Sequence, residues 1–366
     1  MLDPNNENDE LILRIANNKS ITSEEEKRFD KLCQVNQHFI NMYKEVKLSR
    51  LEGSSWDYWC ELHRDFVSST VMFFKVGLKF PYLYRLVVNE SLPENSNQRI
   101  YDARFLKYPP LEIVKKINRY GRANTPDTNM FYATENIDGA LRELRPKKGS
   151  LVTIGKWKCR QKYIFVFPIA GIEEATVLNR KQQDNYAVLM GTIARMNPQL
   201  ARYLKPIVRF YAQEFAKVVD HSDEHYHKAY LYTAQFTKYI LSSQTGRPVP
   251  ITLVDDPDQE FDPLVHIARQ FEKNLPATPS DAELDGITYP SVENLYSLEN
   301  VALKPSSLDN KYYLESAYEF QVTNERYDIT NPTNNYYGQL DELKIQCIDH
   351  TPIQTSRTIN DSEINW

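Results

Sequence analysis

Three side chains whose types could take part in binding or catalysis lie in one short stretch, GRANTPDTNMFYATENIDGALRELRP, which runs from Gly121 to Pro146. Arg122 follows one of only 11 glycines in the chain, Tyr132 lies in a short apolar run, and Glu143 lies in a helix-like segment. A guanidinium presents a planar fork of N–H donors that matches two phosphate oxygens. An aromatic face attracts a cation, and a carboxylate stabilises developing positive charge. The types and spacing of these residues therefore indicate a candidate site.

A strand followed by a helix would position these side chains. The run NMFYAT is typical of a strand, and a helix beginning near Asn136 or Asp138 would follow it. Tyr132 would then project from the sheet, and Glu143 would face it from the helix. Taken singly, each residue also has an ordinary interpretation: Arg122 in a surface turn, Tyr132 in the core and Glu143 on a solvated helix face.

The rest of the chain predicts helices around an α+β core with a mixed sheet. Apolar residues recur every three to four positions from Ser23 to about Lys47, and Ser23 with Glu26 predicts a capping box at the start of that helix. A second helical stretch runs from about Trp56 to Phe74. The runs SLVTIGKW and KYIFVFPI favour strands, and helical segments follow between residues 181 and 242.

Composition changes along the chain predict three regions. Residues 1–95 form a helical N-terminal region with a weakly ordered start, and the segment LPENSNQ reads as the linker that ends it. Residues 96–312 form the main domain, which includes a long excursion at 242–285 with a helical island from His266 to Phe271. Residues 313–366 predict one or two edge strands and a polar tail.

Net charge and cysteine usage exclude several classes of protein. The formal charge of -5 gives no electrostatic reason to expect DNA or an anionic membrane as the main partner, although it leaves local basic patches open. The 4 cysteines form no CxxC pair, which argues against a disulfide framework and a structural zinc site. The polar, acidic start and the shortness of the most apolar run predict a cytoplasmic protein.

Metal sites and the common nucleotide-binding motifs find little support. His221 and His225 lie four residues apart beside Asp220 and Glu224, which is the spacing of metal ligands on a helix, but a solvated polar helix end is the favoured interpretation. The acidic run DDPDQEFD lacks the glycine of a calcium loop. The chain contains no GxGxxG, GxxxxGK[ST], HExxH or GxSxG motif. We therefore expect no metal cofactor.

The opening stretch belongs to a longer pattern that resembles a known family. Followed by GSLVTIGKW, and far downstream by YLYTAQFTKYI and LDGITYPSVENLYSLENVALKP, it is similar to the RES domain, named for its arginine, glutamate and serine. The resemblance covers roughly residues 100–303. It implies a fold like that of the ADP-ribosyltransferases and an activity on NAD, which many members degrade or use to ADP-ribosylate a protein. Many members are bacterial toxins that a partner antitoxin neutralises.

The resemblance assigns roles to individual positions. Arg122 corresponds to the family's dinucleotide-holding arginine, Tyr132 to the tyrosine of the same pocket, and Glu143 and Ser291 to the glutamate and serine. The family also has a Tyr-Arg-x-Arg pattern at the start of the domain. In the matching stretch IYDARF, Asp102 occupies the first arginine position and Arg104 occupies the second.

The implied reaction fits the chemistry of these residues. Cleavage of the nicotinamide–ribose bond builds positive charge on the ribose carbon, which suits a carboxylate such as Glu143. Arg122 and Arg104 suit the pyrophosphate, Tyr132 suits the nicotinamide ring, and Ser291 suits a ribose or phosphate oxygen.

The sequence thus predicts an NAD-consuming enzyme that passes ADP-ribose to water, phosphate or a protein. Two alternatives stay open. In the first, Asp102 marks a catalytically weakened module that binds a nucleotide or a protein, with the N-terminal helices as its interaction surface. In the second, the N-terminal region is an antitoxin-like or RNA-handling part, and the RES-like domain is its effector.

Overall fold

The computed structural model of the chain describes residues 7–16, 18–68, 76–92, 99–100, 102–169, 180–195, 197–242, 283–294, 298–323 and 345–347. The chain divides into two compact units, and each is assembled from separate segments. The first unit comprises residues 1–78, 111–129 and 165–290, and the second comprises 79–110, 130–164 and 291–366. The sequence analysis predicts three continuous regions instead, 1–95, 96–312 and 313–366, and this division of the chain stays a prediction.

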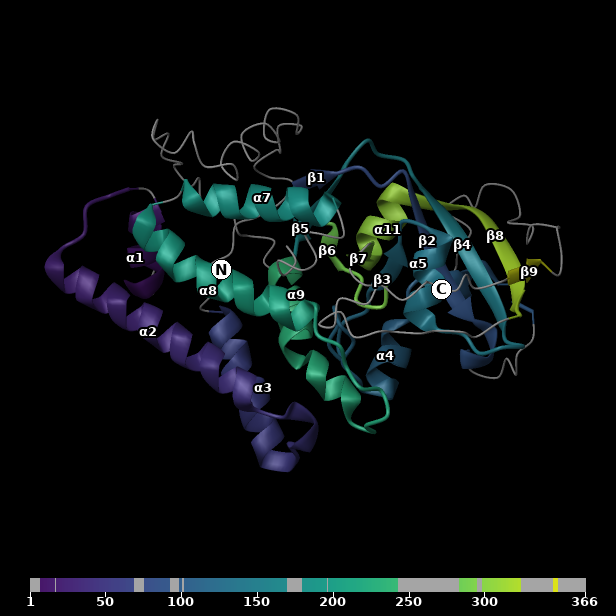
Figure 1. Cartoon of the computed structure of the whole chain (residues 1–366), viewed down its shortest axis with the longest axis horizontal. Coiled ribbons are helices and arrows are strands. Elements are labelled where there is room, and N and C mark those ends of the chain that lie inside the picture. The colour runs from purple at the N-terminus through teal and green to yellow at the C-terminus, as the bar shows by residue number, and fades with distance from the viewer. Residues whose placement is uncertain are drawn as a thin grey trace, which may run out of the picture. The chain divides into compact units, whose positions relative to one another are not determined.

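The first unit is mainly helical (Figure 1). Its helices are α1 (Glu7–Ala16), α2 (Ser23–Glu45), η1 (Leu48–Arg50), α3 (Gly53–Ser68), α4 (Leu111–Ile117), α7 (Arg180–Ala194), α8 (Pro198–Phe215), η4 (Tyr226–Tyr230) and α9 (Leu231–Ser242). Its strands are β1 (Val76–Leu78), β5 (Ile164–Pro168) and β6 (Gly286–Pro290), of which β5 and β6 pair in parallel. The helix predicted to begin near Trp56 is α3. The predicted excursion at 242–285 and its island lie almost wholly outside the described residues.

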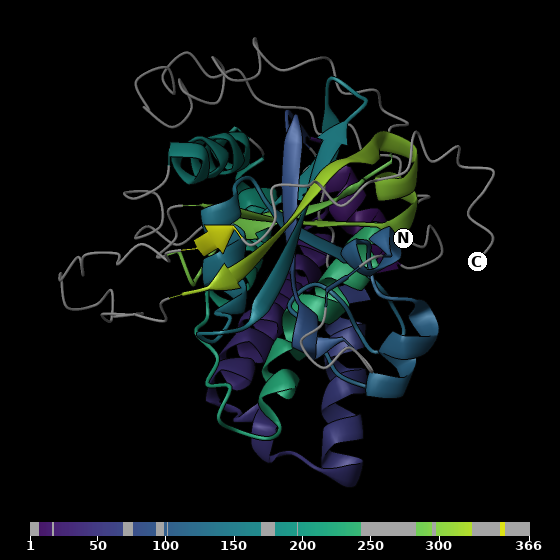
Figure 2. The same ribbon diagram turned by 90° about the vertical axis from the view of Figure 1, so that its right-hand side faces the viewer.

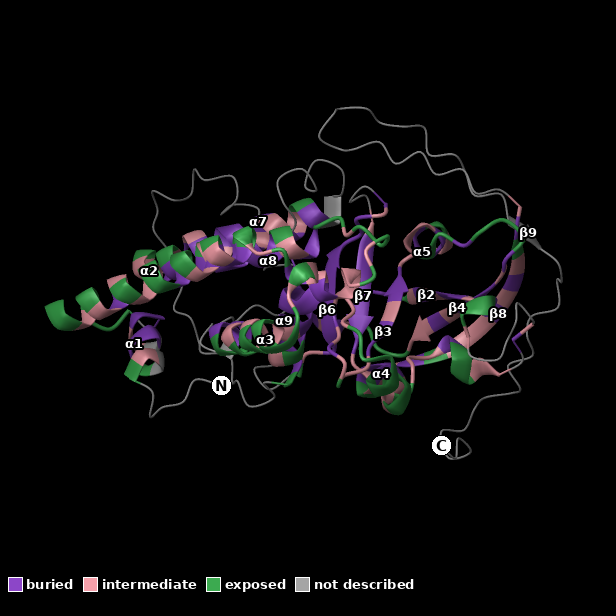
Figure 3. Ribbon diagram, turned by 90° about the horizontal axis from the view of Figure 1, so that it is seen from below, coloured by how far each residue is buried: buried purple, intermediate pink, exposed green. Residues whose placement is uncertain are grey.

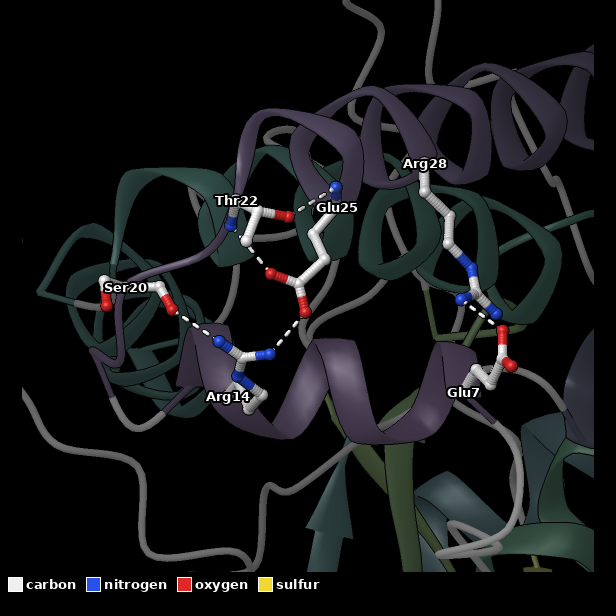
Figure 4. Close-up of polar contacts among 6 residues, drawn as sticks. All are labelled: Glu7, Arg14, Ser20, Thr22, Glu25 and Arg28. Atoms are coloured by element: carbon white, nitrogen blue, oxygen red, sulfur yellow. Dashed lines mark hydrogen bonds and ion pairs between the residues drawn. The ribbon is translucent and has the colours of Figure 1, made fainter.

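The start of α2 corrects the predicted capping box by one residue (Figure 4). Thr22, not Ser23, is the N-cap: its side chain accepts a hydrogen bond from the Glu25 amide at 3.2 Å, and the Glu25 carboxylate accepts one from the Thr22 amide at 2.7 Å. Arg14 of α1 pairs with the same Glu25 and donates to the Ser20 carbonyl at 2.7 Å. This one glutamate therefore caps α2 and ties it to α1.

The core of the first unit is rich in aromatic side chains. The Tyr43 ring of α2 lies 4.9 Å from Tyr232 and 5.5 Å from Phe66, measured between centroids. His63 is fully buried among these rings. Buried aromatic pairs contribute roughly 0.5–1.5 kcal/mol beyond the burial of their area. The apolar faces of α2, α3, α8 and α9 therefore meet in one well-filled centre.

The second unit is built on antiparallel strands. These are β2 (Tyr82–Val88), β3 (Phe131–Thr134), β4 (Leu151–Cys159), β7 (Glu299–Leu303), β8 (Tyr312–Val322) and β9 (Ile345–Cys347), in the order β7-β3-β2-β4-β8-β9. Short helices accompany them: η2 (Asn89–Ser91), η3 (Ala103–Leu106), α5 (Ile137–Leu144) and α11 (Pro305–Lys311). Figure 2 shows β2, β4 and β8 running side by side. The strands predicted at NMFYAT, SLVTIGKW and after Tyr313 are thus confirmed.

Helix α5 covers part of one face of this sheet. Leu141 and Ala140 pack against Leu86 of β2 and against Val152 and Ile154 of β4. These residues are buried. Strand β7 is buried at every residue and is purple in Figure 3. Parallel pairing in the first unit and antiparallel pairing in the second make the protein α+β with a mixed sheet, as predicted. None of the described helices is long and apolar enough to cross a membrane.

Candidate functional site

Glu143 is positioned by a short, firmly anchored helix. The Asn136 side chain caps α5 by accepting a hydrogen bond from the Gly139 amide at 2.7 Å. Thr134 at the end of β3 donates to the Asn136 carbonyl at 2.6 Å, so the helix starts at a fixed angle to the strand. At the other end, Arg145 ends the helix in the left-handed conformation, with φ 43°. Glu143 therefore lies in the last turn of a helix that is held at both ends.

The Glu143 carboxylate is held through one of its two oxygens. Oε1 accepts hydrogen bonds from the Ser291 hydroxyl and from Asn300 Nδ2, the latter at 2.8 Å. Oε2 accepts no hydrogen bond from any of the described residues. An ionised carboxylate has acceptor capacity at both oxygens. This carboxylate is thus fixed in orientation while one oxygen stays available.

Ser291 is oriented by its surroundings as well. It follows the last residue of β6, and its amide donates to the Leu298 carbonyl at 2.8 Å. Its Oγ accepts hydrogen bonds from Asn294, at 2.5 Å from Nδ2 and 3.2 Å from the backbone amide. Because two donors point at this oxygen, its own proton is directed to Glu143. Ser291 and Asn294 are fully buried, so water does not compete for these bonds.

Close packing brings α5 up to the segment that carries Ser291. Asn294 Nδ2 also lies 3.3 Å from the Gly139 carbonyl. A Cβ at Gly139 would approach Leu298 Cδ1 to 3.0 Å and Thr134 Cβ to 3.3 Å, so only glycine fits without displacing a neighbour. The structure thereby joins Glu143 and Ser291, which are 148 residues apart.

Tyr132 lies on the sheet face that faces the site. It is directly opposite Ala302 on β7, and Thr134 is opposite Asn300. Side chains two residues apart on a strand share a face, so Tyr132 projects on the same face as Asn300, which binds Glu143. Its side chain is partly buried.

Arg85 is a buried arginine on the opposite sheet face from Tyr132, and the sequence analysis missed it. Its Nη1 donates to the Tyr132 carbonyl at 3.1 Å, and its guanidinium lies 5.6 Å from the centroid of the Phe131 ring. Its buried Nε has no hydrogen-bond partner among the described residues. Burial lowers the pKa of Arg85 to about 10. The only signal in the sequence was a lone arginine inside the strand-like run YLYRLVV.

Arg104 is already engaged by the carboxylate two residues before it. Its Nε lies 2.7 Å and its Nη2 2.5 Å from Asp102 Oδ2. The hydrogen bond from Arg104 holds the pKa of Asp102 below its usual value. Asp102 also caps η3 by accepting from the Arg104 amide at 2.9 Å. The Arg104 side chain nonetheless remains 59% exposed.

Arg122 belongs to the first unit, where all its described contacts lie. Its Nη1 donates to the carbonyls of Phe215 and Lys217 at 2.6 and 3.2 Å, at the end of α8. Its guanidinium lies 5.0 Å from the centroid of the Tyr230 ring. A cation at the C-terminal end of a helix satisfies terminal carbonyls and complements the helix dipole. Of the predicted residues, the structure therefore joins Glu143 with Ser291, places Tyr132 on their face, and engages Arg104 and Arg122 elsewhere.

The histidines considered as metal ligands lie in turns rather than on a helix. The segment from His221 to His225 forms turns, which corrects the helix on which their spacing was judged. His221 Nε2 lies 3.2 Å from the Tyr230 hydroxyl. Within the described part of the chain, no three His, Cys, Asp or Glu side chains are arranged to hold a metal ion.

The site in the second unit is thus an anchored carboxylate with one available oxygen, held by Asn300 on the sheet face that also carries Tyr132. Its donors come from β7 and from the segment after β6, while the carboxylate comes from α5. Comparison with known proteins gives no match, because no family model, no curated protein and no solved structure is significantly similar to this chain.

Proposed function

We propose that this protein is an NAD-consuming enzyme of the RES type, with a fold like that of the ADP-ribosyltransferases. It cleaves the nicotinamide–ribose bond of NAD+ and passes ADP-ribose to water, phosphate or a protein. The observation that carries the proposal is the Glu143 carboxylate, held through Oε1 by Ser291 and Asn300 with Oε2 available. Both the glutamate and the serine were named on the resemblance, and they are in direct contact.

The proposed step is a glycosidic cleavage. The bond between ribose C1′ and the nicotinamide nitrogen breaks, and its electron pair leaves with nicotinamide, which becomes neutral. The positive charge that develops on the ribose is stabilised by the Glu143 carboxylate. With water as acceptor, the water oxygen bonds to C1′ and one proton is released, which gives ADP-ribose.

Fixing the carboxylate before the reaction favours this chemistry. A group that is already oriented pays no reorganisation cost when charge develops near it. Ser291 and Asn300 supply that orientation from a buried position. Tyr132 is suited to stack on the cationic nicotinamide ring. Arg104, whose side chain is 59% exposed, is the proposed partner of the pyrophosphate, since a guanidinium presents several fixed N–H donors.

Nicotinamide release from NAD+ by the purified protein tests the proposal. Glu143→Gln keeps the shape of the side chain but removes its charge, and we expect a loss in kcat of at least about 100-fold. Glu61→Gln is the matched control, because Glu61 is an exposed helix glutamate whose one ion pair among the described residues is with Arg64 at 3.0 Å. Equal release by wild type and Glu143→Gln would refute the role of this carboxylate.

A second function, binding without turnover, is favoured by the Asp102–Arg104 ion pair. The Asp102 carboxylate accepts hydrogen bonds from the guanidinium of Arg104, which the resemblance assigns to the pyrophosphate. In that case the protein binds NAD+ or a partner protein such as an antitoxin, with the N-terminal helices as a docking surface. Calorimetric NAD+ binding with no nicotinamide release would support it. Replacing the acid by Asp102→Arg should then raise turnover, whereas a loss of existing turnover would show that Asp102 takes part in the reaction.

A further inference from the structure

Lysines and tyrosines alternate in register on one sheet face of the second unit. On neighbouring strands, Tyr82 of β2 is opposite Lys158 of β4, and Lys158 is opposite Tyr313 of β8. In the next row, Tyr84 is opposite Lys156. Residues directly opposite each other in an antiparallel pair project on the same face. The five side chains therefore form one surface.

Further cations border this surface, and each lies over a tyrosine ring. Lys79 and Lys162 each lie 5.4 Å from the centroid of Tyr163, which is in the turn after β4. Arg160 lies 5.4 Å from the centroid of Tyr313. On the strands, Lys156 Nζ lies 4.1 Å from the Tyr82 centroid. We call the whole set the lysine–tyrosine face: Lys79, Tyr82, Tyr84, Lys156, Lys158, Arg160, Lys162, Tyr163 and Tyr313.

The positive charge of this face is only partly neutralised. Glu315 lies at a register shift of β8, and its carboxylate contacts Lys156 Nζ at 2.6 Å and Lys158 Nζ at 3.4 Å. The contacts of Lys79 and Lys162 in this region are with the Tyr163 ring. Among the described residues of this face, the four lysines Lys79, Lys156, Lys158 and Lys162 thus accompany one carboxylate, in a chain whose net charge is -5. The overall charge hides this local excess.

The lysine–tyrosine face is accessible. Helix α5 packs over the other end of the strands, at Leu86, Val152 and Ile154, and of the described residues of this face only Tyr84 packs against that cluster. The Lys158 side chain is 42% exposed and Tyr313 is 36% exposed. Lys79, Arg160 and Lys162 are exposed as well. An incoming molecule can therefore reach the charges and the rings together.

We propose that the lysine–tyrosine face binds single-stranded nucleic acid, a function separate from the proposed reaction on NAD+. Proteins that bind single strands combine cations along the backbone with aromatic rings on which bases stack. Strands lie about 4.8 Å apart, so Tyr82 and Tyr313 are about 10 Å apart across the sheet with Lys158 between them. Such a row offers stacking surfaces on both sides of a phosphate contact.

Duplex DNA and acidic proteins fit this surface less well. Paired bases are stacked inside a duplex and cannot stack on the tyrosines of a sheet face, and duplex reading uses an element that enters a groove. Cations alone would suffice to bind an acidic protein, whereas each cation at the border of this surface lies over a tyrosine ring. The combination points to unpaired bases.

Fluorescence anisotropy with the full chain and a labelled single strand of about 12 nucleotides tests the proposal, since this length suits one sheet surface. At about 50 mM salt, we expect the double variant Arg160→Glu/Lys162→Glu to bind about 10-fold more weakly or worse, with a smaller salt dependence. Tyr313→Ala should weaken binding by about 5-fold or more at unchanged charge. Both changes are on the surface, and circular dichroism checks the fold.

The double variant Lys115→Glu/Lys116→Glu on α4 is the matched control, because it makes the same change in net charge at exposed positions of the first unit. We expect it to retain binding within about 2-fold. Equal losses in both double variants would overturn the proposal in favour of nonspecific attraction. So would binding that survives Tyr313→Ala unchanged, absence of binding by wild type, or preferential capture of a polyglutamate peptide over the oligonucleotide.

Discussion

The two units hold a titratable side chain in opposite ways: His63 is fully buried and Glu143 is partly buried. In the first unit, His63 contacts Gln235 Oε1 through Nδ1 at 2.7 Å and the Tyr211 hydroxyl through Nε2 at 3.3 Å, so both ring nitrogens are occupied. In the second unit, Glu143 uses one oxygen for its two donors and keeps the other available.

This difference separates a polar group that stabilises from one that can react. A buried group whose hydrogen-bonding capacity is filled within the fold fixes its neighbours and offers nothing to a ligand. A group that is anchored at one atom and available at another is both oriented and accessible, which is what catalysis requires. Burial alone therefore does not identify a site. A better indicator is an anchored polar group with unused hydrogen-bonding capacity.

The strongest way to break the comparison is His63→Ala. The change opens a cavity among aromatic rings and leaves Gln235 and Tyr211 without their partner, so we expect a loss of about 3–5 kcal/mol in the free energy of unfolding. Urea denaturation followed by circular dichroism measures it. His38→Ala, at an exposed position of α2, should cost less than about 0.5 kcal/mol. A loss at His63 no larger than that of the control would show that the polar core is dispensable.

If the proposed function holds, Asn300→Ala should mainly lower activity, whereas His63→Ala mainly lowers stability. It removes a hydrogen bond to a carboxylate, worth about 2 kcal/mol, which corresponds to roughly 30-fold lower kcat for nicotinamide release. Asn41→Ala is the control, since the side chain of Asn41 is exposed on α2 and accepts one hydrogen bond within the described part of the chain, from Gln37. If kcat is unchanged while stability falls, Asn300 serves the fold rather than the site.

The pH dependence of stability should follow from His63. Burial lowers the pKa of His63 from 6.5 to about 3, so the ring stays neutral in the folded state and takes up a proton on unfolding below pH 6.5. Its contribution is therefore complete above that pH and is lost as pH falls towards 3. Between pH 7.5 and 5.5 the loss is about 1.4 kcal/mol. The His63→Gln variant should lack this part of the pH dependence; an identical pH profile would contradict the assignment.

The smallest expected effect concerns the cap of α2. Thr22→Ala removes the side chain that accepts from the Glu25 amide, and we expect a loss of about 1 kcal/mol in unfolding free energy. Ser23→Ala, one residue along, removes no cap and should change stability by only a few tenths of a kcal/mol. Thermal denaturation compares the two variants. A larger loss of stability for Ser23→Ala than for Thr22→Ala would instead support Ser23 as the N-cap, as expected from the sequence.

Local patterns in the sequence predicted the helices and strands well because those patterns act over a few residues. The periodicity of α2 and the β-prone runs of β3, β4 and β5 each lie within one segment. The capping box was displaced because TSEEE offers two overlapping pairs with the same spacing, and only the backbone geometry distinguishes them.

The site was less predictable because its partners meet through strand pairing. Glu143 and Ser291 were named on a resemblance, and their contact spans 148 residues. Asn300 had no local signal at all, since its role depends on the register that sets it opposite Thr134. Arg85 looked like any arginine within a strand until its carbonyl partner at Tyr132 was in place.

The interleaving of the two units also has a consequence for synthesis. The chain passes from one unit to the other at 78/79, 110/111, 129/130, 164/165 and 290/291. Strand β3 pairs with β7, which leaves the ribosome only after residue 303. Strand β3 therefore lacks this pairing partner until late in synthesis, and an unpaired strand edge of this kind favours aggregation. A deletion at residue 95 would remove β2, so any shortened form must keep the chain from Lys79 onward.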